Sequence, residues 1–131
     1  MLPITSLIAS LLALYFVWMA IAVIRLRRAN RVALGAGGVA ELEAAIRAHG
    51  NFAEYVPLGL ILLGLCELHS IHPAFVAVVG GLFALGRVIH GQALSKANLK
   101  LRVRGMMLTF GTLITMAIAN IVLTARILWM S

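Results

Sequence analysis

The sequence predicts an all-α membrane protein, a four-transmembrane-helix antiparallel bundle. Of its 131 residues, 63% are hydrophobic and only 11% are charged, and the mean hydropathy is +1.05. A soluble domain is about half apolar and about a quarter charged. Four apolar segments, at approximately 3–26, 52–68, 73–94 and 105–126, each approach the roughly 20 residues that a spanning helix needs. We therefore expect one integral membrane domain over residues 1–131.

The first predicted helix carries no charge from Pro3 to Ile24. It has neither the basic start nor the cleavage pattern of a signal peptide, so we expect it to be a retained span. It should end near residues 28–30. A flexible turn is expected after it at 35–38 (GAGG), because glycine-rich segments interrupt helices.

The second predicted helix begins near residue 39 or 40 and runs to about Leu68. Glu41 and Glu43 fall in its first turn, where carboxylates complement the positive end of the helix dipole. At this length the helix should project beyond the bilayer. Pro57 would lie inside it as a kink that neighbouring helices tolerate.

The third and fourth predicted helices carry small residues four positions apart, a spacing that lets membrane helices approach closely. Pro73 suits the first turn of the third helix. The spacing is seen in Ala77 with Gly81, Gly80 with Ala84, and Gly111 with Thr115 and Ala119. It can serve packing of helices within one chain or contacts between chains, and both explanations remain open.

The net charge of +7 follows the predicted topology and does not indicate a nucleic-acid partner. Basic residues flank the first and third connections, the second connection has none, and Arg126 is the lone exception. The positive-inside rule then places connections one and three in the cytoplasm and both termini outside. The basic residues of the two connections are Arg25, Arg27, Arg28, Arg31 and Arg47, then Lys96, Lys100, Arg102 and Arg104.

A polar stripe opens the second apolar stretch. Arg47, Asn51 and Glu54 are spaced i, i+4 and i+7, which is one face of an α-helix. Charged groups at a membrane entrance are unfavourable unless something polar meets them. Two interpretations remain open: an interhelical network, or a groove in which Glu54 receives an ammonium while Arg47 and Asn51 receive carboxylate and amide groups. Arginine binds carboxylates bidentately, so a groove of this kind suits a zwitterionic, peptide-like ligand.

Polar residues on the third helix and before the fourth extend this pattern. Arg87 either snorkels to headgroups, or pairs with Glu54 or shares a ligand with it. His90 is either a ligand donor or a satisfied packing residue. Arg102 and Arg104 precede the fourth helix, where an arginine can hold an anion such as a thiolate together with the helix N-terminal amides. A nearby arginine lowers a thiol pKa and raises its nucleophilic fraction.

At the opposite end of the chain we expect structural roles. Glu67, His69 and His72 surround the second connection, but one short loop does not supply a convincing zinc site, so no metal is predicted. Cys66 is the one cysteine, which excludes an intrachain disulfide and a thiolate metal cluster. Asn120 is expected to hydrogen-bond between helices.

Together these motifs resemble the MAPEG family (membrane-associated proteins in eicosanoid and glutathione metabolism), and specifically its bacterial branch. The resemblance covers nearly the whole chain, including the four spans with two basic connections. The motifs that carry it are 25–28 (RLRR), 47–51 (RAHGN), 54–57 (EYVP), 86–90 (GRVIH) and 102–104 (RVR).

The resemblance implies a homotrimer that binds glutathione as co-substrate between subunits, near the cytoplasmic face. The arginine that stabilises the glutathione thiolate best matches Arg104, with Arg102 as the fallback. Arg25 would come from the adjoining subunit. The glutathione-binding residues implied in this way are Arg25, Arg47, Asn51, Glu54, Arg87 and His90.

The function implied is that of a bacterial inner-membrane glutathione S-transferase or peroxidase acting on lipophilic electrophiles that arrive from membrane lipid. No metal is needed for this chemistry. Two departures matter: Leu94 stands where the family often has a glutathione-contacting tyrosine, and Gly50 replaces a basic residue found in some relatives. This keeps open a non-catalytic glutathione- or lipid-binding membrane protein. A small proton-coupled transporter using Glu54 is the third alternative, although small exporters of that kind usually carry their acidic residue in the first helix.

Overall fold

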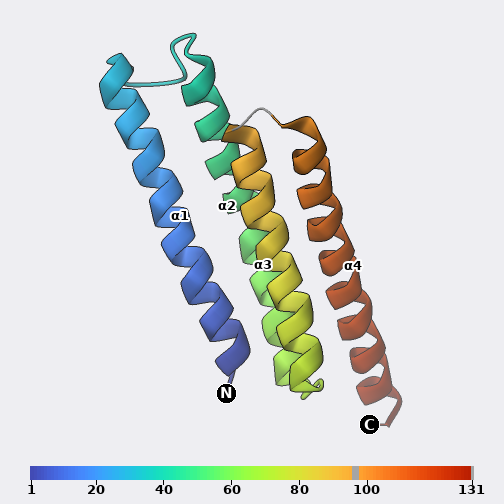
Figure 1. The fold of residues 1–131 in the computed structure, drawn as a ribbon. Coiled ribbons are helices and arrows are strands. Elements are labelled where there is room, and N and C mark those ends of the chain that lie inside the picture. The colour runs from blue at the N-terminus through green and yellow to red at the C-terminus, as the bar shows by residue number, and fades with distance from the viewer. Residues whose placement is uncertain (96–97, 131) are drawn as a thin grey trace.

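The computed structural model describes residues 1–95 and 98–130 and is built from four antiparallel helices. Both termini lie at one end of the molecule, and α2 and α4 begin at the other end (Figure 1). The predicted all-α, four-helix fold is confirmed. The helices are α1 (Pro3–Asn30), α2 (Ala40–Leu68), α3 (Pro73–Ser95) and α4 (Leu99–Met130).

The helix starts follow the local signals in the sequence. As predicted, α2 begins at Ala40, with Glu41 and Glu43 in its first turn. Pro73 opens α3, and Pro57 lies inside α2. The structure differs at α4, which begins well before the predicted residue 105. The reason is the residue before the helix: the Asn98 side-chain oxygen accepts a hydrogen bond from the Leu101 amide at 3.1 Å, a standard N-cap.

The turn between α1 and α2 is organised by α1 itself. Gly35, Gly37 and Gly38 all have positive φ, in the left-handed region that glycine adopts without strain. The Arg27 guanidinium donates to the Gly35 carbonyl at 2.9 Å and to the Ala33 carbonyl at 3.4 Å. Arg27 therefore holds the glycine turn against the end of α1 and is not simply a topology signal.

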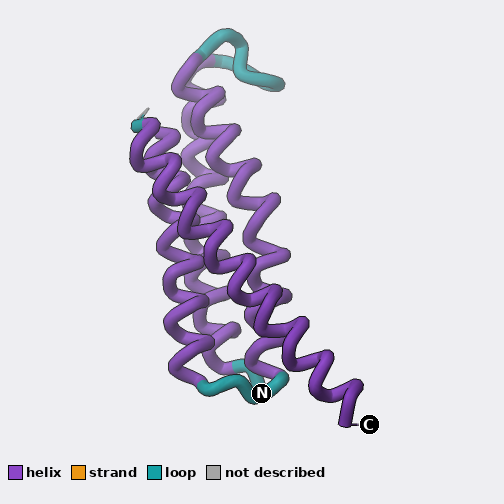
Figure 2. Tube along the Cα trace, turned by 90° about the vertical axis from the view of Figure 1, so that its right-hand side faces the viewer, coloured by secondary structure: helices purple, strands orange, loops and turns teal. Residues whose placement is uncertain are grey.

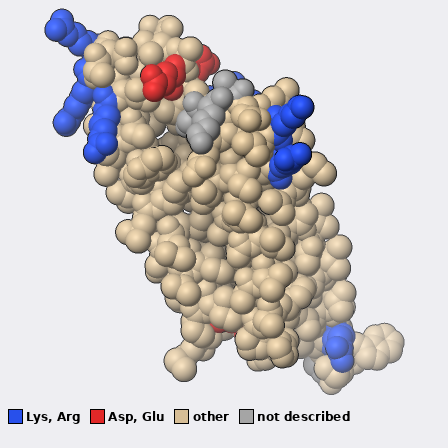
Figure 3. Space-filling view, viewed as in Figure 1, with Lys and Arg blue, Asp and Glu red and all other residues tan. Residues whose placement is uncertain are grey.

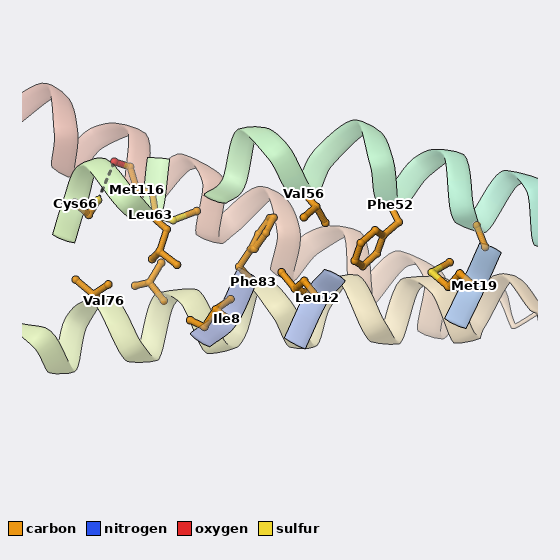
Figure 4. Packing of buried hydrophobic residues seen from close by; sticks show 12 residues of the cluster. Ile8, Leu12, Met19, Phe52, Val56, Leu63, Cys66, Val76, Phe83 and Met116 are labelled. Atoms are coloured by element: carbon orange, nitrogen blue, oxygen red, sulfur yellow. Dashed lines mark hydrogen bonds between the residues drawn. The ribbon is translucent and has the colours of Figure 1, made fainter. Parts of the chain in front are cut away.

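The helices are arranged with α2 and α3 in the centre and α1 and α4 on the flanks (Figures 1 and 2). Among the described residues, α1 and α4 make no contact with each other. The core lies where α1, α2 and α3 meet, with Met116 joining from α4 (Figure 4). Its most enclosed side chains are Phe52, Leu63, Val76, Phe83 and Met116.

The outer surface is apolar around the middle of the molecule. All four helices are long and apolar enough to cross a membrane. Large aliphatic side chains are exposed along α1 and α4, for example Leu14 at 71% and Ile121 at 67%. Lysine and arginine gather at the end where α1 finishes and α4 begins, and the middle of this face shows no charged side chain (Figure 3). The chain is a four-helix membrane protein.

A close approach of α3 and α4 involves glycines outside the predicted small-residue stripes. A Cβ on Gly105 would lie 2.8 Å from the His90 backbone nitrogen and 2.9 Å from the Gly86 carbonyl oxygen. The α3 and α4 backbones therefore touch at this point. Of the predicted stripes, Gly80 does face neighbouring helices, whereas a Cβ on Gly81 or Gly111 would meet nothing within 4 Å.

At the end of the molecule that carries the termini, polar side chains tie helices together. The Glu67 carboxylate, on α2, accepts hydrogen bonds from the Ile4 and Thr5 amides at 2.9 and 2.8 Å. It therefore caps the free N-terminus of α1, a role that the sequence did not reveal. Asn120 of α4 donates to the Leu62 carbonyl of α2 at 3.0 Å, so its predicted interhelical bond is confirmed.

The two histidines near Glu67 face separate partners. The His69 Nδ1 atom lies 3.3 Å from the Asn120 Oδ1 atom. The His72 Nδ1 atom accepts from the Ala74 amide at 3.3 Å, within the connection itself. Each histidine therefore has a hydrogen-bond partner of its own.

Replacing Glu67 with glutamine should destabilise the protein by about 1–2 kcal/mol, because an amide offers one acceptor to two helix N–H groups that now share a carboxylate. The loss would appear as a lower midpoint of unfolding in detergent. Glu43→Gln is the matched control, since Glu43 is exposed in the first turn of α2. Equal midpoints for the two variants would contradict the capping role.

Candidate functional site

A polar pocket of about 390 Å³ opens between α2, α3 and the first turn of α4. Its walls come from three separate stretches of sequence that the fold brings to the end of the molecule opposite the termini. The pocket unites most of the predicted site residues. The residues that line it are Ile46, Arg47, Gly50, Asn51, Glu54, His90, Leu94 and Arg102.

The polar stripe of α2 forms one wall. Arg47, Asn51 and Glu54 face the same pocket, as their helical spacing predicted. Arg47 and Glu54 are exposed, and Asn51 is half-buried. Two opposite charges and an amide are therefore presented along one edge of the pocket.

Arg87 lies behind this wall and is completely buried. Its Nη2 atom donates to the Asn51 Oδ1 atom at 2.6 Å, and its Nη1 atom donates to the Thr109 hydroxyl at 3.3 Å. The guanidinium carbon lies 5.1 Å from the centre of the Tyr55 ring. The interpretation of Arg87 as a snorkelling residue is wrong, because burial of this depth leaves no path to the headgroups. On α2 the guanidinium bonds Asn51, whereas the alternative to snorkelling was a pair or a shared ligand with Glu54.

The bond from Arg87 fixes which way the Asn51 amide points. A guanidinium can only donate, so the Asn51 oxygen must face Arg87. The amide nitrogen of Asn51 is then free to donate toward the pocket. A ligand carbonyl or carboxylate is the group that this nitrogen would bind.

His90 is oriented by the backbone of α4. Its ring is 2% exposed, and its Nδ1 atom lies 3.3 Å from the Arg102 carbonyl oxygen. Because a carbonyl only accepts, Nδ1 carries the proton in this bond and the neutral ring keeps an acceptor at Nε2. The same bond ties the first turn of α4 to α3 and holds Arg102 at the pocket.

Two of the predicted residues lie outside this lining. Arg25 and Arg104 are both exposed, the first near the end of α1 and the second in the second turn of α4. Of the two arginines preceding the fourth predicted span, it is Arg102, the fallback, that lines the pocket. Leu94 also lines the pocket, so an apolar side chain occupies part of its wall.

The sequence missed the groups that support Arg87. Thr109 is fully buried and bonds both Arg87 and the Gly105 carbonyl of its own helix. Tyr55 lies one turn after Asn51, which places its ring beside the guanidinium. The i, i+4 spacing could have indicated Tyr55. Thr109 gave no signal, because a threonine inside a membrane helix usually bonds only its own backbone.

The chemistry of this pocket suits a small zwitterion with amide groups. Arg47 and Arg102 can bind carboxylates, Glu54 can bind an ammonium group, and Asn51 can donate to a carbonyl. Within residues 1–95 and 98–130, no cluster of three or more histidine, cysteine or acidic side chains could hold a metal ion.

The fold and the pocket together define a small four-helix membrane protein with a polar site at one end. A model of the MAPEG family matches residues 5–122, and the chain belongs to this family. An inner membrane protein, YecN, of Escherichia coli strain K12 is 35% identical over 118 residues, which is 90% of this chain and 90% of the relative. YecN of Escherichia coli O6:H1 strain CFT073 matches with the same identity and coverage.

Proposed function

We propose that this protein binds glutathione in the pocket between α2, α3 and α4. The observation that carries the proposal is the pocket itself: two guanidinium groups, a carboxylate, an amide and an imidazole surround one space. Glutathione offers two carboxylates, an ammonium group and two amide bonds. Membership of a family that includes glutathione-related enzymes supports the same ligand.

Each side chain then has a role that follows from its chemistry. Glu54 receives the ammonium group, and Arg47 receives a carboxylate bidentately. The Asn51 amide nitrogen donates to the ligand backbone, held in place by Arg87. His90 contributes an acceptor at Nε2 and fixes the backbone of Arg102.

Arg102 is our candidate for the group that stabilises the thiolate. It lies in the first turn of α4, where the helix N-terminus also favours an anion. An adjacent guanidinium lowers the thiol pKa from about 8.5, which increases the nucleophilic fraction at neutral pH. Arg104 is the second candidate for stabilising the thiolate. It does not line the pocket of its own chain, so it would have to act from outside that pocket.

The reaction we propose is attack of this thiolate on a lipophilic electrophile, as in a glutathione S-transferase, which forms a carbon–sulfur bond as a leaving group departs or a strained ring opens. With a peroxide, the thiolate would take one oxygen as the O–O bond breaks and an alcohol leaves, and a second glutathione would then form the disulfide and release water. The second substrate would enter laterally from the membrane lipid. We further propose a homotrimer in a bacterial inner membrane, with the basic connections in the cytoplasm. In such an assembly Arg25, exposed at the end of α1, would reach the pocket of a neighbouring subunit.

The second candidate is a glutathione- or lipid-binding protein without catalysis. The observation that favours it is Leu94 in the pocket wall, because a leucine provides no hydrogen-bond donor for the thiol. Both candidate functions include glutathione binding. They differ in whether the protein stabilises the thiolate form of the bound glutathione.

Ultraviolet difference absorbance detects the glutathione thiolate. It can therefore distinguish an enzyme from a non-catalytic binding protein, and Arg102 from Arg104 as the group that stabilises the thiolate. Wild-type protein with glutathione at neutral pH should give a thiolate signal. Arg102→Ala should lose this signal by about tenfold or more while binding weakens less, because the charge acts on the thiol. Arg104→Ala is the matched control. Loss in Arg104→Ala alone would reassign the role, and saturable binding without thiolate in the wild type would support the non-catalytic candidate.

A further inference from the structure

A second pocket lies between α1, α2 and α3 and shares no lining residue with the polar pocket. Its volume is about 300 Å³. The space-filling view shows the surface hollowed between the upper parts of α1 and α3 (Figure 3). Its lining residues are Tyr15, Trp18, Met19, Ala22, Ala45, Ala48, Gly91 and Gln92.

Small side chains create the space. Ala22 of α1 and Ala45 and Ala48 of α2 stand where larger residues would fill the gap between the helices. Gly91 of α3 instead lets the Tyr15 side chain pack directly against its backbone. A Cβ on Gly91 would lie 2.8 Å from the Tyr15 hydroxyl oxygen. The pocket is therefore a feature of three helices together, and it sits beside the packed core at Met19 and Ala48.

The α1 side of the pocket is aromatic. The Tyr15 and Trp18 rings stack with their centres 5.5 Å apart and an angle of 20° between their planes. Behind them, Phe52 packs against Tyr15 at 5.5 Å. Trp18 is 59% exposed, so much of its indole is not covered by the protein. The Met19 thioether adds a polarizable group of the kind that packs well on aromatic rings.

Two polar groups complete the lining. They are the Tyr15 hydroxyl and the Gln92 amide, and neither forms a side-chain hydrogen bond within the described part of the chain. Both groups can donate and accept. A ligand with one polar atom could bond to them while its rings lie against Trp18 and the alanines.

The geometry points to a second small-molecule site in this pocket, which takes a flat aromatic molecule of two or three rings carrying one hydrogen-bonding group. Ring stacking on Tyr15 and Trp18 selects aromatic surface over a flexible chain. The volume lies at the lower end of the range for ligand pockets, which begins at about 300 Å³. None of the described residues that line the pocket is charged, so a neutral ligand suits it.

This site is separate from the proposed glutathione chemistry. Ala45 and Ala48 lie on a different face of α2 from Arg47 and Glu54, as their helical positions require. A ligand stacked on Trp18 would have the α2 and α3 helices between it and the polar pocket. Occupancy of the aromatic site is thus expected with or without glutathione.

Tryptophan fluorescence tests the site, because the chain has two tryptophans, Trp18 and Trp129. Trp129→Phe leaves Trp18 as the reporter, and Trp18→Phe leaves Trp129, near the far end of α4. The probe is 1-nitronaphthalene, a neutral two-ring quencher, titrated into full-length protein in detergent. We expect saturable quenching of Trp18 and only weak, non-saturating quenching of Trp129.

Two filling variants complete the test. Ala45→Leu and Ala22→Leu, each made on the Trp129→Phe background, should weaken the saturable quenching by about tenfold or more, because leucine occupies the space of the ligand. Thermal unfolding shows which of the two variants is folded, and one folded variant is enough for the test. Non-saturating quenching of Trp18, equal to that of Trp129, would overturn the site. So would saturable quenching that a folded filling variant leaves unchanged.

Discussion

Replacing Gly105 with alanine is expected to destabilise the protein and to abolish ligand binding at the polar pocket. The new methyl group would lie 2.8 Å from the His90 backbone nitrogen and 2.9 Å from the Gly86 carbonyl oxygen. These are backbone atoms that cannot rotate away, so α3 and α4 must separate. Overpacking of this kind costs about 1–3 kcal/mol.

The effect on binding follows from the same displacement. Gly105 lies where α4, which carries Arg102, touches α3, which carries His90. The bond between the His90 ring and the Arg102 carbonyl holds the two helices together. If α4 moves outward, that bond lengthens and Arg102 leaves the pocket. We expect no saturable heat with glutathione in a calorimetric titration of Gly105→Ala, together with a lower unfolding midpoint.

Gly111→Ala provides the matched control on the same helix. A Cβ at Gly111 meets nothing within 4 Å, so this change should be neutral or stabilise α4 by up to about 1 kcal/mol. Ligand binding should be unchanged. Equal behaviour of the two variants would contradict the close contact between α3 and α4.

Replacing Arg87 with methionine is expected to separate ligand binding from stability. Methionine is shorter than arginine, but its flexible side chain fills most of the space with apolar atoms. Removing a fully buried guanidinium whose Nε atom has no hydrogen-bond partner relieves a desolvation penalty. The unfolding midpoint should therefore stay the same or rise.

Glutathione affinity should nevertheless fall in Arg87→Met by about 10- to 100-fold, or about 1.5–3 kcal/mol. Without the 2.6 Å bond from Arg87, the Asn51 amide can rotate and point its oxygen at the ligand. Arg87 is in this sense a positioning residue. Calorimetry measures the affinity, and thermal unfolding in the same detergent measures the stability.

Asn120→Leu serves as the control for Arg87→Met. It removes a buried polar side chain that bonds the Leu62 and Met116 carbonyls toward the other end of the helices. Its unfolding midpoint should fall while glutathione affinity is preserved. Wild-type affinity in folded Arg87→Met would show that the orientation of Asn51 does not matter.

The fold was predictable because its signals are local. Continuous apolar stretches define four spans, and prolines and first-turn carboxylates mark the helix starts. The stripe of Arg47, Asn51 and Glu54 was likewise predictable, since helical spacing alone places the three on one face. Both features depend only on residues close together in the sequence.

The parts that could not be predicted depend on contacts between helices. The burial of Arg87 requires the register of α2 against α3 and α4, which no single helix encodes. The Glu67 cap joins residues separated by more than 60 positions. Which of Arg102 and Arg104 lines the pocket depends on where α4 begins. With the Asn98 cap, α4 begins at Leu99, earlier in the chain than the hydropathy pattern indicated.

Calorimetric titration of glutathione into detergent-purified wild-type protein, repeated with Glu54→Gln, tests the central proposal most directly. We expect saturable binding by the wild type. We also expect about tenfold or more weaker binding by Glu54→Gln, because glutamine has no charge with which to neutralise the ligand ammonium group. Glu43→Gln, which changes an exposed carboxylate outside the pocket, should bind like the wild type. No saturable heat from folded wild-type protein at millimolar glutathione would contradict glutathione binding in this pocket.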